Sequence, residues 1–162
     1  MRRLLALAIA AVLAVAVALP AGADNGRNFN AAPLRGANEV PAVDSQANGV
    51  ATFKLSEDGM SLEYKLIVAN LSDILQSHIH IGAPGTNGGV VAFLYPDGPP
   101  PILIPGPTSG ILAQGVITAE DLIGSLVGQP LSALIDQIAA GNAYVNVHTT
   151  ANPGGEIRAQ IG

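Results

Sequence analysis

The chain has 162 residues, of which 49% are hydrophobic and 12% are charged, and it contains 19 glycines and 12 prolines. This balance excludes a disordered acidic tail and a long solvated coiled coil, and it is typical of a globular domain with frequent turns. The formal net charge of −5 argues against a protein that binds nucleic acid or another polyanion.

Residues 1–23 have the pattern of a signal peptide. The chain starts Met-Arg-Arg, residues 4–19 are an uninterrupted apolar run, and residues 21–23 read Ala-Gly-Ala, which signal peptidase accepts. The run is shorter than the roughly 20 residues of a membrane anchor. We therefore predict cleavage before Asp24 and a secreted or periplasmic, extracytoplasmic location, with no membrane span in the mature chain. Cleavage would remove Arg2 and Arg3, so the formal charge of the mature chain would be −7. The chain has no cysteine, so no disulfide can form.

The N-terminal part of the mature chain divides into a tail and a hairpin. Residues 24–32 are polar and Asn-rich and are expected to be a flexible tail, with one domain over residues 33–162. Residues 50–55 and 61–68 alternate between apolar and polar side chains on either side of a Ser-Glu-Asp-Gly turn. Alternation with a period of two predicts a β-hairpin that is covered on one face.

Further short strands are predicted at residues 77–81, 90–94, 143–149 and 156–161. Short strands between Gly-rich turns are typical of two-layer and barrel folds. The expected fold is an all-β antiparallel sandwich or barrel, immunoglobulin-like or superoxide-dismutase-like, with one or two short helices in its connections.

The segments that interrupt these strands are two helical pieces and a proline-rich stretch. Residues 118–121 resemble a capped helix start, and residues 131–140 place apolar side chains at helical spacing before Gly141. Six of the twelve prolines lie within residues 96–107. Because proline cannot donate to a sheet ladder, we expect a stiff surface loop without regular strand pairing there.

The three histidines of the chain are the candidate metal ligands. His78 and His80 are two residues apart in a predicted strand, so both side chains project from one face with Cα atoms roughly 6–7 Å apart. His148 shares a face of its own strand with Tyr144 and Asn146. If the two strands are neighbours, the three imidazoles meet, and three imidazoles with an open position suit copper or zinc.

A structural role for the same histidines is the competing interpretation, in which they donate hydrogen bonds to loop carbonyls and hold the turn that starts at Gly82. The sequence leaves both interpretations open. No other catalytic group is expected, since Ser77 and His78 point to opposite faces of their strand and cannot form a triad. Glu156 and Arg158 share a strand face, and a structural ion pair between them or with Glu39 is predicted.

In their order along the chain, several sequence blocks resemble the CHRD domain, the module named after chordin. The blocks are Leu34–Pro41, His78–Gly82 with Gly85 and Gly88, Tyr144–Thr149 and Pro153–Arg158. The resemblance covers residues 33–162 and implies an extracellular all-β module of the stand-alone type that bacteria export. It does not transfer growth-factor binding, because the cysteine-rich repeats of chordin are missing here.

The His-x-His strand also resembles, more loosely, the copper-zinc superoxide dismutases, but this chain has neither their further histidines nor their disulfide. We expect an exported, non-enzymatic binding or structural module that acts on an extracellular or envelope partner, with His78, His80 and His148 as the candidate metal ligands. The alternative is a small metal-dependent redox or hydrolytic enzyme that uses the same histidines. A purely structural envelope component is a third interpretation.

Overall fold

The computed structural model describes residues 27–162, so the predicted signal peptide and the first three residues of the predicted tail lie outside the described residues. Seven strands and one α-helix are present in the described part. The elements are β1 (Asn28–Arg35), β2 (Asn48–Leu55), β3 (Leu62–Ile81), β4 (Gly89–Tyr95), β5 (Ile104–Ile117), α1 (Leu131–Ala139), β6 (Ala143–Thr149) and β7 (Ile157–Gln160), with 3-10 turns at Gly36–Asn38, Ala119–Asp121 and Gly124–Leu126.

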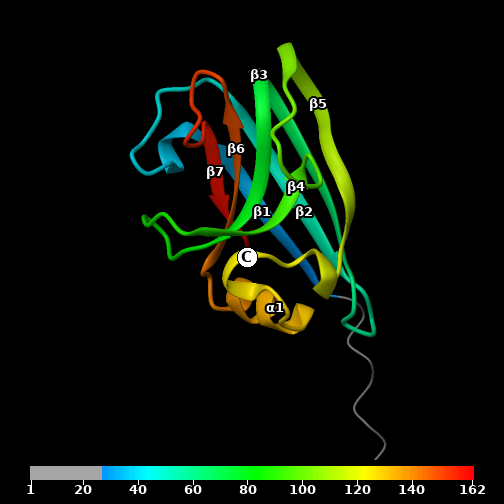
Figure 1. The fold of residues 1–162 in the computed structure, drawn as a ribbon. Coiled ribbons are helices and arrows are strands. Elements are labelled where there is room, and N and C mark those ends of the chain that lie inside the picture. The colour runs from blue at the N-terminus through cyan, green and yellow to red at the C-terminus, as the bar shows by residue number, and fades with distance from the viewer. Residues whose placement is uncertain (1–26) are drawn as a thin grey trace, which may run out of the picture.

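All strand pairings in the described residues are antiparallel, and their ladder closes on itself in the order β3, β2, β1, β7, β6 and back to β3. The strands β4 and β5 pair with β3 along its other edge. Figure 1 shows the resulting barrel-like arrangement, with β3 running its full height. The predicted all-β antiparallel fold is confirmed.

The predicted hairpin is present as β2 and the first half of β3, which are in register from Asn48 opposite Ala69 to Leu55 opposite Leu62. The sequence predicted residues 77–81 as a separate strand, whereas the structure joins them to the hairpin in one 20-residue strand. The link passes through two residues with positive φ, Asn70 (58°) and Asp73 (53°), where β3 bends and its partners change. The bend lets one strand take part in both halves of the molecule.

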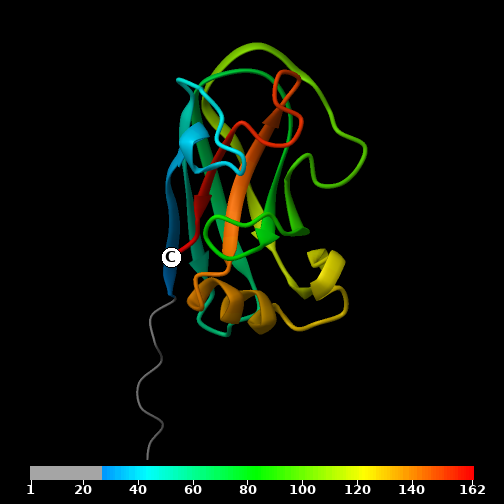
Figure 2. The same ribbon diagram turned by 90° about the vertical axis from the view of Figure 1, so that its left-hand side faces the viewer.

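Two segments predicted to be irregular are strands in the structure. Residues 28–32 of the predicted tail belong to β1, which pairs with β2 and also exchanges backbone hydrogen bonds between Asn30 and the C-terminal Gly162. Figure 2 shows the C-terminus beside β1. The last four residues of the predicted proline loop begin β5, where Ile104 and Pro107 pair with β3. Proline is tolerated there because β5 lies along the edge of the sheet.

The inner faces of the strands and one side of α1 form a continuous apolar core. The predicted helix at residues 131–140 is confirmed as α1, which lies at one end of the barrel (Figure 1). Its four large apolar side chains are buried: Leu131, Leu134, Ile135 and Ile138. It ends before Gly141, which has a positive φ of 71°. The predicted capped turn at residues 118–121 is a short 3-10 turn in which Thr118 and Asp121 form a capping box. Among the described residues no helix is long and apolar enough to cross a membrane.

Candidate metal centre

The pairing of β3 with β6 determines where the three histidines lie. His78 is directly opposite Asn146, and His80 is directly opposite Tyr144, so all four side chains leave the sheet on the same face. His148 follows Asn146 by two residues on that face and is a diagonal neighbour of His78. The two strands are therefore neighbours, which is the condition under which the sequence brings the histidines together, and the structure places His78, His80 and His148 side by side.

The three imidazole rings form a compact cluster. One ring nitrogen from each histidine lies within 4.8 Å of the corresponding nitrogens of the other two. The closest approach is between His78 Nδ1 and His148 Nε2, at 3.1 Å. Two ligand nitrogens bound tetrahedrally at 2.0–2.1 Å from one zinc ion would be about 3.4 Å apart. The more distant nitrogens, up to 4.8 Å apart, would have to approach one another to bind one ion.

Two of the rings are oriented by loop carbonyls. His80 Nδ1 donates to the carbonyl oxygen of Gly88, and His148 Nδ1 donates to that of Pro153, each at 2.9 Å. The structural interpretation from the sequence is correct in predicting such bonds. A hydrogen bond at Nδ1 sets the tautomer and leaves the lone pair on Nε2 facing the cluster, which is how proteins commonly orient metal-binding histidines. In His148 this lone pair accepts the hydrogen bond from His78 Nδ1. The hydrogen bonds to the loops are therefore compatible with ligation by the other nitrogen.

Burial keeps these imidazoles neutral. His78, His80 and His148 are only 3%, 7% and 6% exposed. Burial, with the neighbouring histidines, lowers the pKa of His78 to about 3, and burial is also the main cause that lowers the pKa of His148 to about 4. The pKa of His80 is lowered by burial and by the charge of Arg158, against opposing contributions from Gly88 and Asn146. Three neutral imidazoles are in the protonation state that metal binding requires.

A stack of three side chains supports the cluster from β6 and β7. The ring of Tyr144 lies parallel to that of His80, with an interplanar angle of 8° and centroids 4.8 Å apart. The guanidinium of Arg158 lies over Tyr144, 3.4 Å from the ring centroid. Arg158 is only 2% exposed. This stack fixes the plane of His80 and puts a positive charge behind it.

Arg158 is held by the loop that follows β3 and not by the ion pair expected from the sequence. Its guanidinium donates to the carbonyl oxygen of Thr86 at 2.8 Å and to the side chains of Asn87 and Gln160. The carboxylate of Glu156 accepts hydrogen bonds from Ser45 and Thr149 instead. The predicted partnership of Arg158 with Glu156 is therefore wrong, because facing loops supply closer partners.

Burial raises the pKa of Glu39 to about 7, and the positive charge of Arg158 opposes this rise only in part. Its Oε1 atom is buried and has no hydrogen-bond partner among the described residues. In the same part of the chain, buried atoms without partners also include His78 Nε2, His80 Nε2 and Asn146 Oδ1. The cluster thus gathers several lone pairs that no donor satisfies.

Phe93 of β4 completes the wall of the cluster on the side of β3 away from β6. It is directly opposite His78 in the ladder, and the two rings meet edge to face with centroids 5.0 Å apart. Phe93 also lines a surface cavity of about 500 Å³ whose walls include Asp97 and Glu120 but none of the three histidines. Sequence reasoning missed Phe93 and the stacking role of Tyr144, because both depend on which strands are neighbours.

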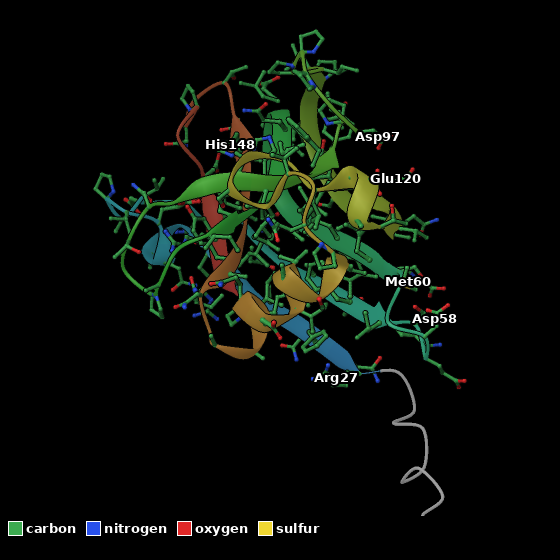
Figure 3. All side chains as sticks on the ribbon, turned by 60° about the horizontal axis from the view of Figure 1, so that its bottom comes forward. Arg27, Asp58, Met60, Asp97, Glu120 and His148 are labelled. Atoms are coloured by element: carbon green, nitrogen blue, oxygen red, sulfur yellow. The ribbon has the colours of Figure 1, made fainter. Side chains whose placement is uncertain are left out.

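Figure 3 shows His148 at the far side of the molecule from the β2–β3 turn, where Asp58 and Met60 project outward.

The family model of the CHRD domain matches residues 30–161 of this chain, a range that contains all residues of the cluster. No match was found among curated proteins or among solved structures.

Proposed function

Because this chain belongs to the CHRD domain family, we propose that it is an exported, non-enzymatic binding or structural module in which His78, His80 and His148 hold one copper or zinc ion. The location, secreted or periplasmic, rests on the signal-peptide pattern of residues 1–23. The partner is a protein or ligand outside the cytoplasm.

The observation that carries the metal site is the arrangement of the imidazole lone pairs. His80 and His148 each use Nδ1 for a loop carbonyl, and the Nε2 of each faces the cluster; that of His148 accepts a hydrogen bond from His78 Nδ1, which a bound ion would replace. The Nε2 atoms of His78 and His80 have no hydrogen-bond partner in the part of the chain that the structure describes. Burying an acceptor in this way costs free energy, and an ion bound through such an atom would remove that cost.

Burial favours a module over an enzyme. The three ligands are at most 7% exposed, and the neighbouring 500 Å³ cavity reaches Phe93 and not the rings. An enzyme needs its metal's open position to be reached by substrate. Burial of the ligands hinders access least for a very small substrate, so a superoxide-dismutase-like redox enzyme is the stronger enzymatic alternative. Hydrolysis of a larger substrate is the weaker one.

The test is metal binding by the protein purified without a histidine tag. We expect one equivalent of zinc or copper, and we expect His78→Ala, His80→Ala and His148→Ala each to weaken binding by about 100-fold or more. Ser77→Ala is the matched control, because Ser77 is equally buried with an unpartnered hydroxyl but points to the opposite face of β3.

A measurement of the free energy of unfolding with and without zinc complements the binding experiment. Zinc at about 100 times its Kd should raise the free energy of unfolding of the wild type by about 2.7 kcal/mol and leave that of His80→Ala unchanged. If the wild type binds no metal at concentrations on the order of micromolar and the histidine variants merely unfold earlier, the cluster is structural and the proposed metal site is wrong.

A further inference from the structure

The amide oxygen of Asn146 occupies the centre of the histidine face. Asn146 is directly opposite His78, diagonal to His80, and two residues before His148 on the same face of β6. The side chain is 2% exposed, and its Oδ1 has no hydrogen-bond partner among residues 27–162. An amide oxygen has two lone pairs, so an unused one in this position is an acceptor available to a ligand.

The two ends of the Asn146 amide face different surroundings. Asn146 and His80 leave the two strands on the same face, and neither Asn146 Oδ1 nor His80 Nε2 has a hydrogen-bond partner among the described residues. A Cβ placed on Gly155 would lie 2.8 Å from Asn146 Nδ2 and 2.5 Å from Glu39 Oε1. The NH₂ end therefore lies beside Gly155 and a buried carboxyl group, which leaves the oxygen for the histidine side.

We propose that Asn146 Oδ1 is the fourth donor of the metal centre, which makes it a site of three imidazole nitrogens and one oxygen that prefers a divalent ion such as Zn²⁺ over Cu⁺. This inference rests on the proposed metal site. In tetrahedral zinc sites with three histidines the fourth position is taken by an oxygen, usually that of water, and the amide oxygen would take that position here. Cu⁺ is selected by soft sulfur ligands, and the chain has no cysteine.

Glu39 acts in this arrangement as a positioning residue. Its carboxyl group and the Asn146 NH₂ approach the same point beside Gly155, where only a glycine leaves room for both. Glu39 Oε1 forms no hydrogen bond with the described residues, but an acceptor on the Nδ2 side disfavours an amide turned with its oxygen toward Glu39, so it favours the orientation in which the oxygen faces the rings. Ligating groups are commonly held by partners of this kind.

The experiment compares Zn²⁺ and Cu⁺ affinities, the latter without oxygen, in the wild type, Asn146→Leu and Asn146→Asp, with Ser77→Ala as the control. Leucine has nearly the shape of asparagine but offers no donor. We expect Asn146→Leu to weaken Zn²⁺ binding at least about tenfold and Cu⁺ binding less than about threefold. Asn146→Asp, which keeps an oxygen, should bind Zn²⁺ at least as tightly as the wild type, and Ser77→Ala should change neither.

The outcomes separate this inference from the function on which it rests. Wild type without metal overturns both. Two outcomes would overturn the role of Asn146 and leave the three-histidine site, provided that the wild type binds zinc. In one, Asn146→Leu binds zinc as tightly as the wild type; in the other, it loses Zn²⁺ and Cu⁺ affinity in parallel. A measurement on the wild type covers the case in which Asn146→Leu does not fold. Zn²⁺ should shift the ¹³C resonance of the Asn146 side-chain carbonyl downfield and not that of the exposed Asn70, and the absence of such a shift overturns the inference.

Discussion

The two halves of β3 show opposite behaviour on their outer faces, although they belong to one strand. From Leu62 to Val68 every second side chain is buried and the residues between them are exposed, as in a sheet with one wet face. From Ser77 to His80 all four residues are buried. The inner face is buried in both halves and apolar apart from Ser77, so the difference between the halves concerns mainly the outer face.

The second half is covered by loops, and polar side chains of the sheet hold those loops in place. Arg158 and His80 bind the loop between β3 and β4, through Thr86 and Gly88, and His148 binds the loop before β7 through Pro153. A covered polar face must satisfy its hydrogen bonds within the protein, because water no longer does so. The comparison indicates that this molecule has one apolar core and a second, polar interior on the other side of the same strand.

The largest effects should come from the inner face and should be equal in the two halves. Leu66 and Ile79 are both fully buried in the apolar core, one in each half of β3. We expect Leu66→Ala and Ile79→Ala each to lower the free energy of unfolding by about 2–5 kcal/mol, measured by urea denaturation. A loss at Ile79 of less than half that at Leu66 would show that the second half is not part of the same core.

The outer face should distinguish the halves. Arg158→Met should cost about 2–4 kcal/mol, because it leaves the Thr86 carbonyl and the Gln160 amide oxygen without their buried donor. Lys65→Met on the exposed outer face of the first half should change stability by less than about 0.5 kcal/mol. Equal costs in urea denaturation would contradict the distinction between a wet and a covered face.

Two glycines with positive φ offer a smaller, matched contrast. A Cβ on Gly59 (φ 73°), in the β2–β3 turn, would have nothing within 4 Å, whereas a Cβ on Gly155 (φ 128°) would meet Glu39 and Asn146. Both alanine variants suffer backbone strain, and only Gly155→Ala also crowds buried polar groups. Gly155→Ala should therefore be less stable than Gly59→Ala by about 1–2 kcal/mol in thermal unfolding. Identical melting behaviour would mean that the loop before β7 yields freely.

The pH dependence of stability should report the ionisation of Glu39. Its pKa is about 7 in the folded protein against 4.5 ordinarily, because burial outweighs the charge of Arg158. The folded state thus binds this proton more tightly, and the stabilisation is complete below pH 4.5 and is lost as the pH rises through 7.

The lowered pKa values of His78 and His148 have the opposite effect on stability, which falls as the pH falls below 6.5. The variant Glu39→Gln separates the contribution of Glu39 from that of the histidines. The stability of Glu39→Gln relative to the wild type should increase steadily between pH 4.5 and 7 in denaturant titrations. A difference that does not vary with pH would show that Glu39 ionises normally.

Some of this protein was determined by local sequence. Strict alternation at residues 50–55 and 61–68, together with the turn between them, predicted the hairpin, and helical spacing before Gly141 predicted α1. These patterns are readable because they reflect burial of one face within a single element. The His-x-His spacing likewise placed His78 and His80 on one side of their strand, since side chains alternate along any strand.

Other features were decided only by the tertiary structure. Residues 28–32 and 104–107 have no strand pattern of their own, and they are extended because β2, β3 and the chain end offer them edges to pair with. The meeting of His148 with His78 and His80, and the central place of Asn146, follow from the register of β6 on β3. Strand register and neighbour choice are set by packing across the whole barrel, so no local pattern in the sequence contains them.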